Sequence, residues 1–178
     1  GSNGQLGTVL TQVLQKKYGV DNVIASDLKK KTSFKGVFEI LDATDFNRLQ
    51  EIVVHYKITQ VYHLAAILSA TGESNPLKTW DINMQTWLNV LEVARIHKLE
   101  RVFYPSSIAV FGATALKIAT PNTAFLDPST VYGISKASGE NWANYYHEKY
   151  GLDVRSIRYP GVIGYQSLPG GGTTDYAV

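Results

Sequence analysis

The chain has 178 residues, 44% of them hydrophobic and 18% charged, and its 17 basic and 15 acidic side chains give a formal charge of +2. This length is enough for one domain with its own core, and the composition excludes collagen-like, low-complexity and disordered chains. The small net charge and the absence of cysteine exclude a charge-driven nucleic-acid or membrane partner, disulfides, thiolate metal sites and thiol nucleophiles.

Short apolar runs alternate with amphipathic stretches along the chain. The apolar runs predict buried strands at residues 23–27, 37–42, 61–66, 101–107 and 154–159. Apolar residues three and four apart predict helices at residues 6–18, 45–57, 80–98 and 132–150. Thr44 is the expected N-cap of the second helix, and Gly19 and Gly151 are expected C-terminal caps. Because parallel neighbours need a crossover connection, this alternation predicts an α/β domain with a doubly wound parallel sheet.

Three glycines precede the first predicted helix with a spacing typical of dinucleotide-binding turns. Gly1, Gly4 and Gly7 would let the backbone turn tightly, approach a pyrophosphate and pack the helix against the sheet. A plain glycine turn would give the same spacing. The strand that would confirm a dinucleotide-binding turn would precede Gly1, and the given sequence does not include it. Asp27, at the end of the predicted strand 23–27, supports the dinucleotide interpretation. Its carboxylate would accept hydrogen bonds from both hydroxyls of an adenosine ribose and repel a 2′-phosphate, which favours NAD over NADP.

Other strand-end residues could serve the same cofactor. Asp42 could accept a hydrogen bond from the adenine amino group, or be an ordinary turn carboxylate. Ala65 and Ala66 would let the backbone pass close to a cofactor, or let a helix pack closely. Lys29, Lys30 and Lys31 could neutralise a phosphate if they folded inward, although a solvated loop is the plainer interpretation of this run.

A serine, a tyrosine and a lysine form the most informative set. Tyr132 and Lys136 lie four apart on a predicted helix, so the ammonium can stabilise the phenolate. A phenol, whose usual pKa is about 10, becomes a base near neutral pH only with such help. Taken alone, the pair could be a surface tyrosine and lysine. However, Ser106 and Ser107 end a strand and place a hydroxyl at the carboxyl edge of the sheet, where open α/β folds bind ligands.

Together with the glycine turn, this set resembles the extended branch of the short-chain dehydrogenase/reductase superfamily, which includes sugar-nucleotide epimerases, over essentially the whole chain. A narrower resemblance, to the epimerase-like NAD-dependent L-threonine 3-dehydrogenases, rests on residues 23–27, 63–70, 105–112, 155–161 and 169–178. It implies a Rossmann-like enzyme that transfers a hydride from C3 of L-threonine to NAD⁺ and gives 2-amino-3-oxobutanoate.

The resemblance also implies residue roles. Tyr132 matches the general base, Ser107 the hydroxyl that polarises the reacting oxygen, with Ser106 as second choice, and Lys136 the residue that bonds the nicotinamide ribose and lowers the tyrosine pKa. Asn83 matches an asparagine that supports the site. The expected cofactor-binding residues are Gly1, Gly4, Gln5, Leu6, Gly7, Asp27, Asp42, Ala65, Ala66, Asn83, Tyr132, Lys136, Tyr159 and Pro160. The expected substrate-binding residues are Ser69, Ser107, Tyr132, Thr173 and Thr174.

We expect residues 1–178 to be one NAD-binding domain of a longer protein, without the first strand and the C-terminal substrate-binding region that the resemblance implies. The expected partners are L-threonine and a second copy of the chain, paired through the helices at 80–98 and 132–150. No metal is expected, since the histidines lack ligand spacing. No segment approaches the roughly 18 apolar residues of a membrane span, so we expect a cytoplasmic protein.

Two alternatives remain open. A sugar-nucleotide epimerase or dehydratase of the same superfamily would use the same tyrosine and lysine on another substrate. A non-catalytic dinucleotide sensor would keep the glycine turn but have no chemical need for Ser107, Tyr132 and Lys136.

Overall fold

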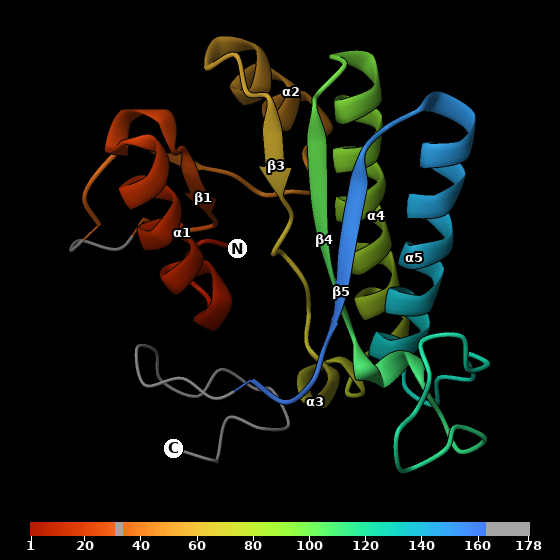
Figure 1. Ribbon diagram of the computed structural model, residues 1–178. Helices are drawn as coiled ribbons and strands as arrows, with labels where there is room; N and C mark the ends of the chain where they lie inside the picture. Colours follow the sequence, from red (N-terminus) through yellow and green to blue (C-terminus); the bar gives the residue numbers. More distant parts are fainter. Residues whose placement is uncertain (31–33, 163–178) are drawn as a thin grey trace.

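The computed structural model describes residues 1–30 and 34–162 (Figure 1). Strands and helices alternate along the chain in the order α1 (Gln5–Tyr18), η1 (Val20–Asn22), β1 (Ala25–Asp27), β2 (Phe38–Ile40), α2 (Phe46–His55), β3 (Gln60–Tyr62), α3 (Ser69–Gly72), α4 (Pro76–Ile96), β4 (Arg101–Ser107), η2 (Ile108–Val110), α5 (Val131–Tyr150) and β5 (Val154–Tyr159). Among these described residues, no helix is both long and apolar enough to cross a membrane.

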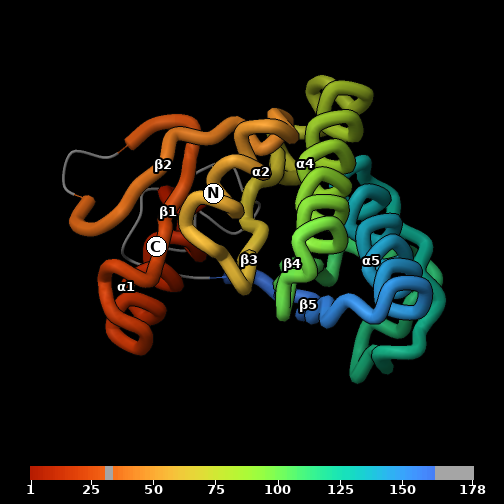
Figure 2. Tube along the Cα trace, turned by 90° about the horizontal axis from the view of Figure 1, so that it is seen from above, coloured from red at the N-terminus to blue at the C-terminus, as the bar shows by residue number. Residues whose placement is uncertain are grey.

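All strand pairs are parallel, as predicted. β1 pairs with β2, and β3, β4 and β5 form a second sheet with β4 in the middle. In Figure 2, α1 lies on one side of the strands, and α2, α4 and α5 lie on the other. This is the α/β Rossmann-like arrangement expected from the alternating pattern, with helices on both faces.

An apolar cavity of about 510 Å³ separates the two sheets. Its lining includes residues of β1 and β3 together with apolar side chains of α1 and α2, among them Leu10, Leu14, Leu49 and Ile52. A strand placed between β1 and β3 could pair with both, and the resemblance described above implies a first strand before the glycine turn.

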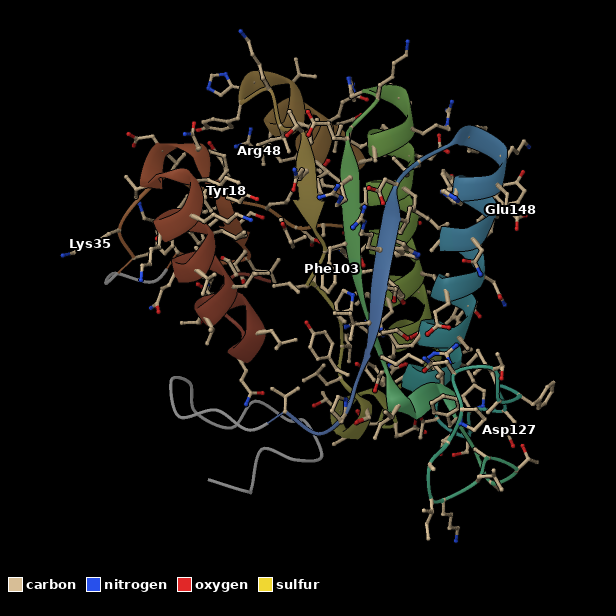
Figure 3. The ribbon with its side chains drawn as sticks, in the orientation of Figure 1. Tyr18, Lys35, Arg48, Phe103, Asp127 and Glu148 are labelled. Atoms are coloured by element: carbon tan, nitrogen blue, oxygen red, sulfur yellow. The ribbon has the colours of Figure 1, made fainter. Side chains whose placement is uncertain are left out.

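The main core lies between the three-stranded sheet and the helices α2, α4 and α5. Its most deeply buried side chains are Trp87, Leu91, Val93, Ala94 and Val102. Charged residues lie at the periphery, as Figure 3 shows for Lys35 and Glu148. The core therefore anchors β4 and α5, the two elements that carry the predicted serine, tyrosine and lysine.

The predicted N-cap of α2 is wrong by one residue. Asp45, not Thr44, caps the helix, because the Asp45 Oδ1 atom accepts a hydrogen bond from the Arg48 N–H at 3.0 Å. The Thr44 hydroxyl donates instead to Asp42 Oδ1 at 2.7 Å. The predicted glycine caps are confirmed: Gly19 and Gly151 follow α1 and α5 with positive φ angles.

Four other predicted elements also have different boundaries in the structure. The helix predicted from residue 80 begins at Pro76, where the missing N–H of proline costs nothing and Asn75 caps the first turn through the Lys78 N–H. The strand predicted at 61–66 ends at Tyr62. The backbone N–H of His63 still donates to the Phe103 carbonyl at 3.0 Å. Beyond His63 the chain lies against the glycine turn and no longer pairs with β4. The strands predicted at 23–27 and 37–42 are shorter in the structure, as β1 and β2. Those predicted at 101–107 and 154–159 are β4 and β5, with the same bounds.

The loop after β4 is held together by one carboxylate. Asp127, labelled in Figure 3, accepts hydrogen bonds from the Gly112 N–H at 2.8 Å and from both the N–H and the hydroxyl of Thr114. These bonds lower the pKa of Asp127, with those from Thr114 contributing most. The loop therefore returns the chain in a fixed way to the start of α5.

Candidate active site

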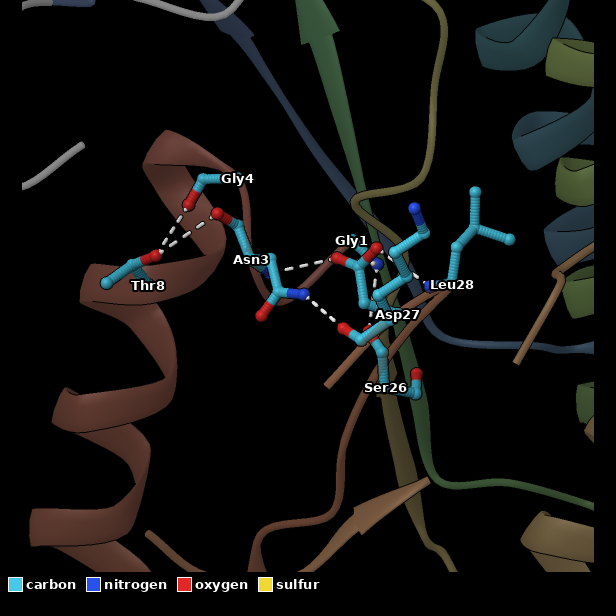
Figure 4. A network of polar contacts seen from close by, with 8 residues as sticks. Gly1, Asn3, Gly4, Thr8, Ser26, Asp27 and Leu28 are labelled. Carbon is cyan, nitrogen blue, oxygen red and sulfur yellow. Dashed lines mark hydrogen bonds and ion pairs between the residues drawn. The ribbon is translucent and has the colours of Figure 1, made fainter. Parts of the chain in front are cut away.

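The glycine turn is packed against the end of β1 (Figure 4). The Asn3 N–H donates to Asp27 Oδ2 at 2.9 Å. A Cβ atom on Gly7 would lie 2.2 Å from the Gly1 carbonyl oxygen, and one on Gly1 would lie 2.5 Å from the carbonyl carbon of Leu64. These positions admit only glycine, and the turn consequently lies directly against the chain that follows β3.

The Asp27 carboxylate lies at this turn with its side chain 22% exposed. Its Oδ1 atom accepts from the Leu28 N–H at 2.8 Å, and its Oδ2 atom from Asn3. Each carboxylate oxygen can accept more than one hydrogen bond, so both can still take a ligand hydroxyl. Of the neighbouring basic run, the carbonyl of Lys29 accepts from the Asn3 side-chain amide at 2.6 Å, and Lys31 lies outside the described residues.

Several expected cofactor-binding residues surround the turn. Ala65 borders it, since a Cβ on Gly1 would lie 2.8 Å from the Ala65 nitrogen, and Ala66 follows in the same extended segment. Gln5 and Leu6 form the start of α1, and the Gln5 amide donates to the Val162 carbonyl at 3.2 Å. This bond ties the helix after the turn to the segment that follows β5.

Asp42 is placed as a turn carboxylate. It is exposed and accepts from the Thr44 N–H at 2.9 Å as well as from the Thr44 hydroxyl. The backbone hydrogen bond from Thr44, followed by the hydroxyl bond, lowers its pKa. The structure therefore accounts for Asp42 through its local turn, and an adenine contact remains a proposal.

Asn83 is buried, and its amide is committed to the protein. Its Oδ1 atom accepts from the Ile67 N–H at 2.8 Å, and its Nδ2 atom donates to the Ile67 carbonyl at 3.1 Å and to Ser135 Oγ at 3.3 Å. The Ser135 hydroxyl in turn donates to the Tyr132 carbonyl at 2.8 Å. Asn83 thus fixes the segment after β3 to the helix that carries Tyr132, which agrees with a supporting role.

The start of α5 brings the predicted base to the end of β4. The Thr130 hydroxyl caps the helix by accepting from the Gly133 N–H, and Glu73 accepts from the Val131 N–H at 2.9 Å. Burial raises the pKa of Tyr132, and the Ser107 side chain lowers it in part. The predicted serine therefore lies close enough to the predicted base to influence its pKa.

Lys136 is almost completely buried next to that phenol. Its ammonium nitrogen lies 5.4 Å from the centre of the Tyr132 ring and donates to the Pro105 carbonyl at 2.7 Å. Burial lowers its pKa to about 8. Within residues 1–30 and 34–162, that carbonyl is its single hydrogen-bond acceptor, so an ammonium with three donors can still bond a ligand hydroxyl.

The two serines at the end of β4 have different partners. The Ser106 hydroxyl donates to Glu140 Oε1 at 2.5 Å, and Arg158 forms a bidentate ion pair with the same carboxylate at 2.9 and 2.7 Å. Ser107 instead accepts from the Ala109 N–H at 3.1 Å, and its side chain influences the pKa of Tyr132. The sequence interpretation missed Glu140 and Arg158, although Glu140 follows Lys136 by four residues on the same helix face.

Of the remaining residues expected at the site, some lie in the described part of the structure and others do not. Tyr159 lies opposite Ser107 in the β4–β5 register, and Pro160 follows it, so both are at the same sheet edge as the serine. Ser69 begins the short helix α3. Thr173 and Thr174 lie outside the described residues.

Comparisons with known proteins agree with this geometry. Residues 1–175 match the model of the NAD dependent epimerase/dehydratase family. An uncharacterized epimerase/dehydratase from Staphylococcus saprophyticus is 48% identical over the whole chain, and one from Staphylococcus epidermidis is 46% identical. The chain spans 57% of the length of each of these two relatives.

Solved structures are similar over almost the whole chain. A GalE-like L-threonine dehydrogenase from Cupriavidus necator in its holo form is 52% identical, with a TM-score of 0.97 over 100% of this chain and 58% of its own. The L-threonine dehydrogenase from Clostridium difficile is 47% identical, with a TM-score of 0.96 over 100% of this chain and 57% of its own. The UDP-glucose 4-epimerase from Thermus thermophilus, in complex with NAD, is 25% identical, with a TM-score of 0.89 over 98% of this chain and 58% of its own. The chain thus belongs to the NAD-dependent epimerase/dehydratase family, and its cofactor is NAD.

Proposed function

We propose that the protein containing this chain is an NAD-dependent L-threonine 3-dehydrogenase. What carries the proposal is that Ser107, Tyr132 and Lys136 lie together at the end of β4, in a chain 52% identical to a threonine dehydrogenase but only 25% identical to a UDP-glucose 4-epimerase. The reaction converts L-threonine and NAD⁺ into 2-amino-3-oxobutanoate, NADH and a proton.

The residues of the site fit NAD. The glycine turn leaves no room for side chains at Gly1 and Gly7, the Asp27 carboxylate can accept ribose hydroxyls, and the Lys136 ammonium has unused donors. When bound, NAD supplies the oxidised nicotinamide that accepts the hydride and the positive charge that favours a nearby phenolate.

Within this scheme Tyr132 accepts the proton of the C3 hydroxyl, and Ser107 hydrogen-bonds the same oxygen. Burial raises the pKa of Tyr132, so its phenolate needs a neighbouring cation, and Lys136 is the buried cation beside its ring. We propose that Ser69, Thr173 and Thr174 contact the amino and carboxylate groups of threonine, and that residues beyond this chain complete the substrate pocket.

The substrate assignment predicts a simple pattern of turnover. The full-length protein should form NADH, measured by its absorbance, when given L-threonine and NAD⁺. It should not interconvert UDP-galactose and UDP-glucose in a coupled assay. The reverse pattern would assign the protein to the epimerases, and NAD binding without either activity would favour the sensor.

The position of Asp27 predicts the choice of cofactor. Replacing Asp27 with Ser should weaken NAD binding by about 10-fold or more, since a hydrogen bond to a charged group contributes about 1.5–3 kcal/mol. It should also narrow the preference for NAD over NADP, because no carboxylate would repel the 2′-phosphate. Titration calorimetry with both cofactors measures the change, with Glu51→Gln on the exposed face of α2 as control. Unchanged affinity in Asp27→Ser would remove Asp27 from the cofactor site.

We also propose that the whole protein forms a homodimer. Exposed aromatic and apolar side chains on α4 and α5, namely Ile96, Trp142 and Tyr150, would be covered by the same helices of a second copy.

A further inference from the structure

The Lys136 ammonium lies over the face of a second aromatic ring, which the mechanism above does not use. Its nitrogen is 4.6 Å from the centre of the Tyr104 ring, closer than its 5.4 Å from the Tyr132 ring. Tyr104 is buried in the middle of β4, one residue before Pro105, whose carbonyl accepts from the same ammonium. Strand β4 thus supplies both a ring face and a carbonyl to this cation.

Several contacts fix the Tyr104 ring itself. It stacks on the Trp87 indole, with ring centres 4.2 Å apart and planes at 24°. The His63 imidazole is nearly parallel to it, with ring centres 6.4 Å apart and planes at 7°. The Tyr104 hydroxyl donates to the Ser135 carbonyl at 3.4 Å. The ring therefore belongs to a cluster of three aromatic side chains, Trp87, Tyr104 and His63, which lies beside the lysine.

Gly139 makes room for this ring. A Cβ atom at Gly139 would lie 2.1 Å from the Tyr104 phenolic oxygen and 2.5 Å from the ring carbon that bears it. The Gly139 carbonyl also accepts from the Trp87 indole N–H at 3.1 Å. Glycine is unfavourable inside a helix, so its presence in the middle of α5 suits a position that must admit a neighbouring ring.

Lys136 has few other groups to compensate its buried charge. Among the described residues, the titratable groups besides Tyr104 that interact with it are Tyr132 on α5 and His63 after β3, and Glu140 follows it by four residues on α5. His63 is buried and neutral near pH 7, and Glu140 is bonded to Arg158 and Ser106. A desolvated ammonium without a carboxylate gains most from an aromatic face, since the attraction between cation and ring grows when water is excluded.

We propose that Tyr104 is a positioning residue, whose ring face holds the Lys136 ammonium beside Tyr132 and the cofactor, and that Gly139 is required to admit this ring. The proposal rests on the proposed function for its catalytic consequence, but its binding consequence requires only that the protein binds NAD. A purely structural Tyr104 would stabilise the core without influencing how Lys136 is charged or placed.

Two substitutions of Tyr104 separate these roles in the full-length protein. Tyr104→Phe keeps the ring, whereas Tyr104→Leu removes it. For Tyr104→Leu we expect NADH affinity at neutral pH to fall about 10-fold, and the apparent pKa of NADH binding to fall by about one unit, because the ammonium loses its support. Tyr104→Phe should stay within about 2-fold of wild type in affinity. NADH fluorescence titrations from pH 6 to 10 measure both quantities.

Leu152→Ala is the matched control, because Leu152 is buried in the same core but lies beyond the other end of α5. It should lower stability without moving the pH profile. Gly139→Ala tests the same point without removing any core side chain, and it should change NADH binding in the direction of Tyr104→Leu. If Tyr104→Leu fails to fold, the NADH binding profile of Gly139→Ala tests the proposal in its place.

Equal NADH profiles for wild type, Tyr104→Leu and Gly139→Ala would overturn the proposal, as would a shift of the same size in Leu152→Ala. Failure of the wild-type protein to oxidise threonine, with NADH binding intact, would refute only the proposed function. The binding comparison would still decide the role of Tyr104.

Discussion

Replacing Tyr132 with Phe is expected to reduce threonine turnover of the full-length protein by at least ~100-fold, the range of lost acid–base catalysis. The substitution removes only the phenolic oxygen, whose pKa the Ser107 side chain influences. The ring next to Lys136 stays, so NAD should bind almost as tightly as to the wild-type protein. Steady-state NADH formation gives the first quantity, and a fluorescence titration gives the second.

The same helix offers a matched control. Tyr145 and Lys149 repeat the four-residue spacing of Tyr132 and Lys136, and their side chains are hydrogen-bonded and exposed. Tyr145→Phe also removes one phenolic oxygen beside a lysine, but far along α5 from the end of β4. It should leave turnover unchanged. Equal turnover in Tyr132→Phe and wild type would remove Tyr132 as the base.

These two pairs also show what spacing can predict. Both place an ammonium near a phenol, yet the hydrogen bond from Lys149 lowers the pKa of Tyr145, whereas burial raises that of Tyr132. The sequence distinguishes them only through Ser107, which predicts a strand end close to one pair. Spacing therefore predicts the contact, and only the tertiary structure determines whether water reaches it.

The residues alone do not distinguish Ser106 from Ser107, and it was the resemblance that favoured Ser107. Both hydroxyls end the same strand, and which one faces Tyr132 depends on partners distant in the chain. Glu140, thirty-four residues later, accepts from Ser106 and is itself held by Arg158 on β5. Long-range ion pairs of this kind leave no local pattern.

The overall arrangement of strands and helices could be predicted from the sequence, whereas short elements and helix caps could not. Hydrophobic periodicity gave the parallel α/β arrangement and the helices that became α1, α2, α4 and α5. It did not predict α3, since four residues are too few to show a helical period, nor the N-cap of α2, since Thr44 and Asp45 are both good capping residues. Which of two neighbouring residues caps the helix depends on the backbone conformation of its first turn, which the sequence pattern does not show.

His63 predicts a loss of stability in mild acid. It is 6% exposed, its Nε2 atom lies 3.4 Å from Thr86 Oγ1, and it stacks against Trp87 and Tyr104. Burial, followed by the positive charge of Lys136, lowers its pKa to about 3 from 6.5. Between these two pH values the unfolded chain binds one proton more than the folded chain does, so stability rises with pH across this window and falls on acidification.

The expected loss between pH 6.5 and pH 5 is about 2 kcal/mol, since one bound proton corresponds to about 1.4 kcal/mol per pH unit. Carboxylates with lowered pKa, such as Asp153, act mostly below this range, because an unfolded aspartate titrates near pH 4. His63→Gln should flatten the slope even though its stability at pH 7 is lower, whereas His55→Gln, an exposed position on α2, should retain it. Urea unfolding midpoints at half-unit pH steps measure the slope. A slope that survives in His63→Gln would mean that other groups produce it, and that His63 binds as many protons in the folded chain as in the unfolded one.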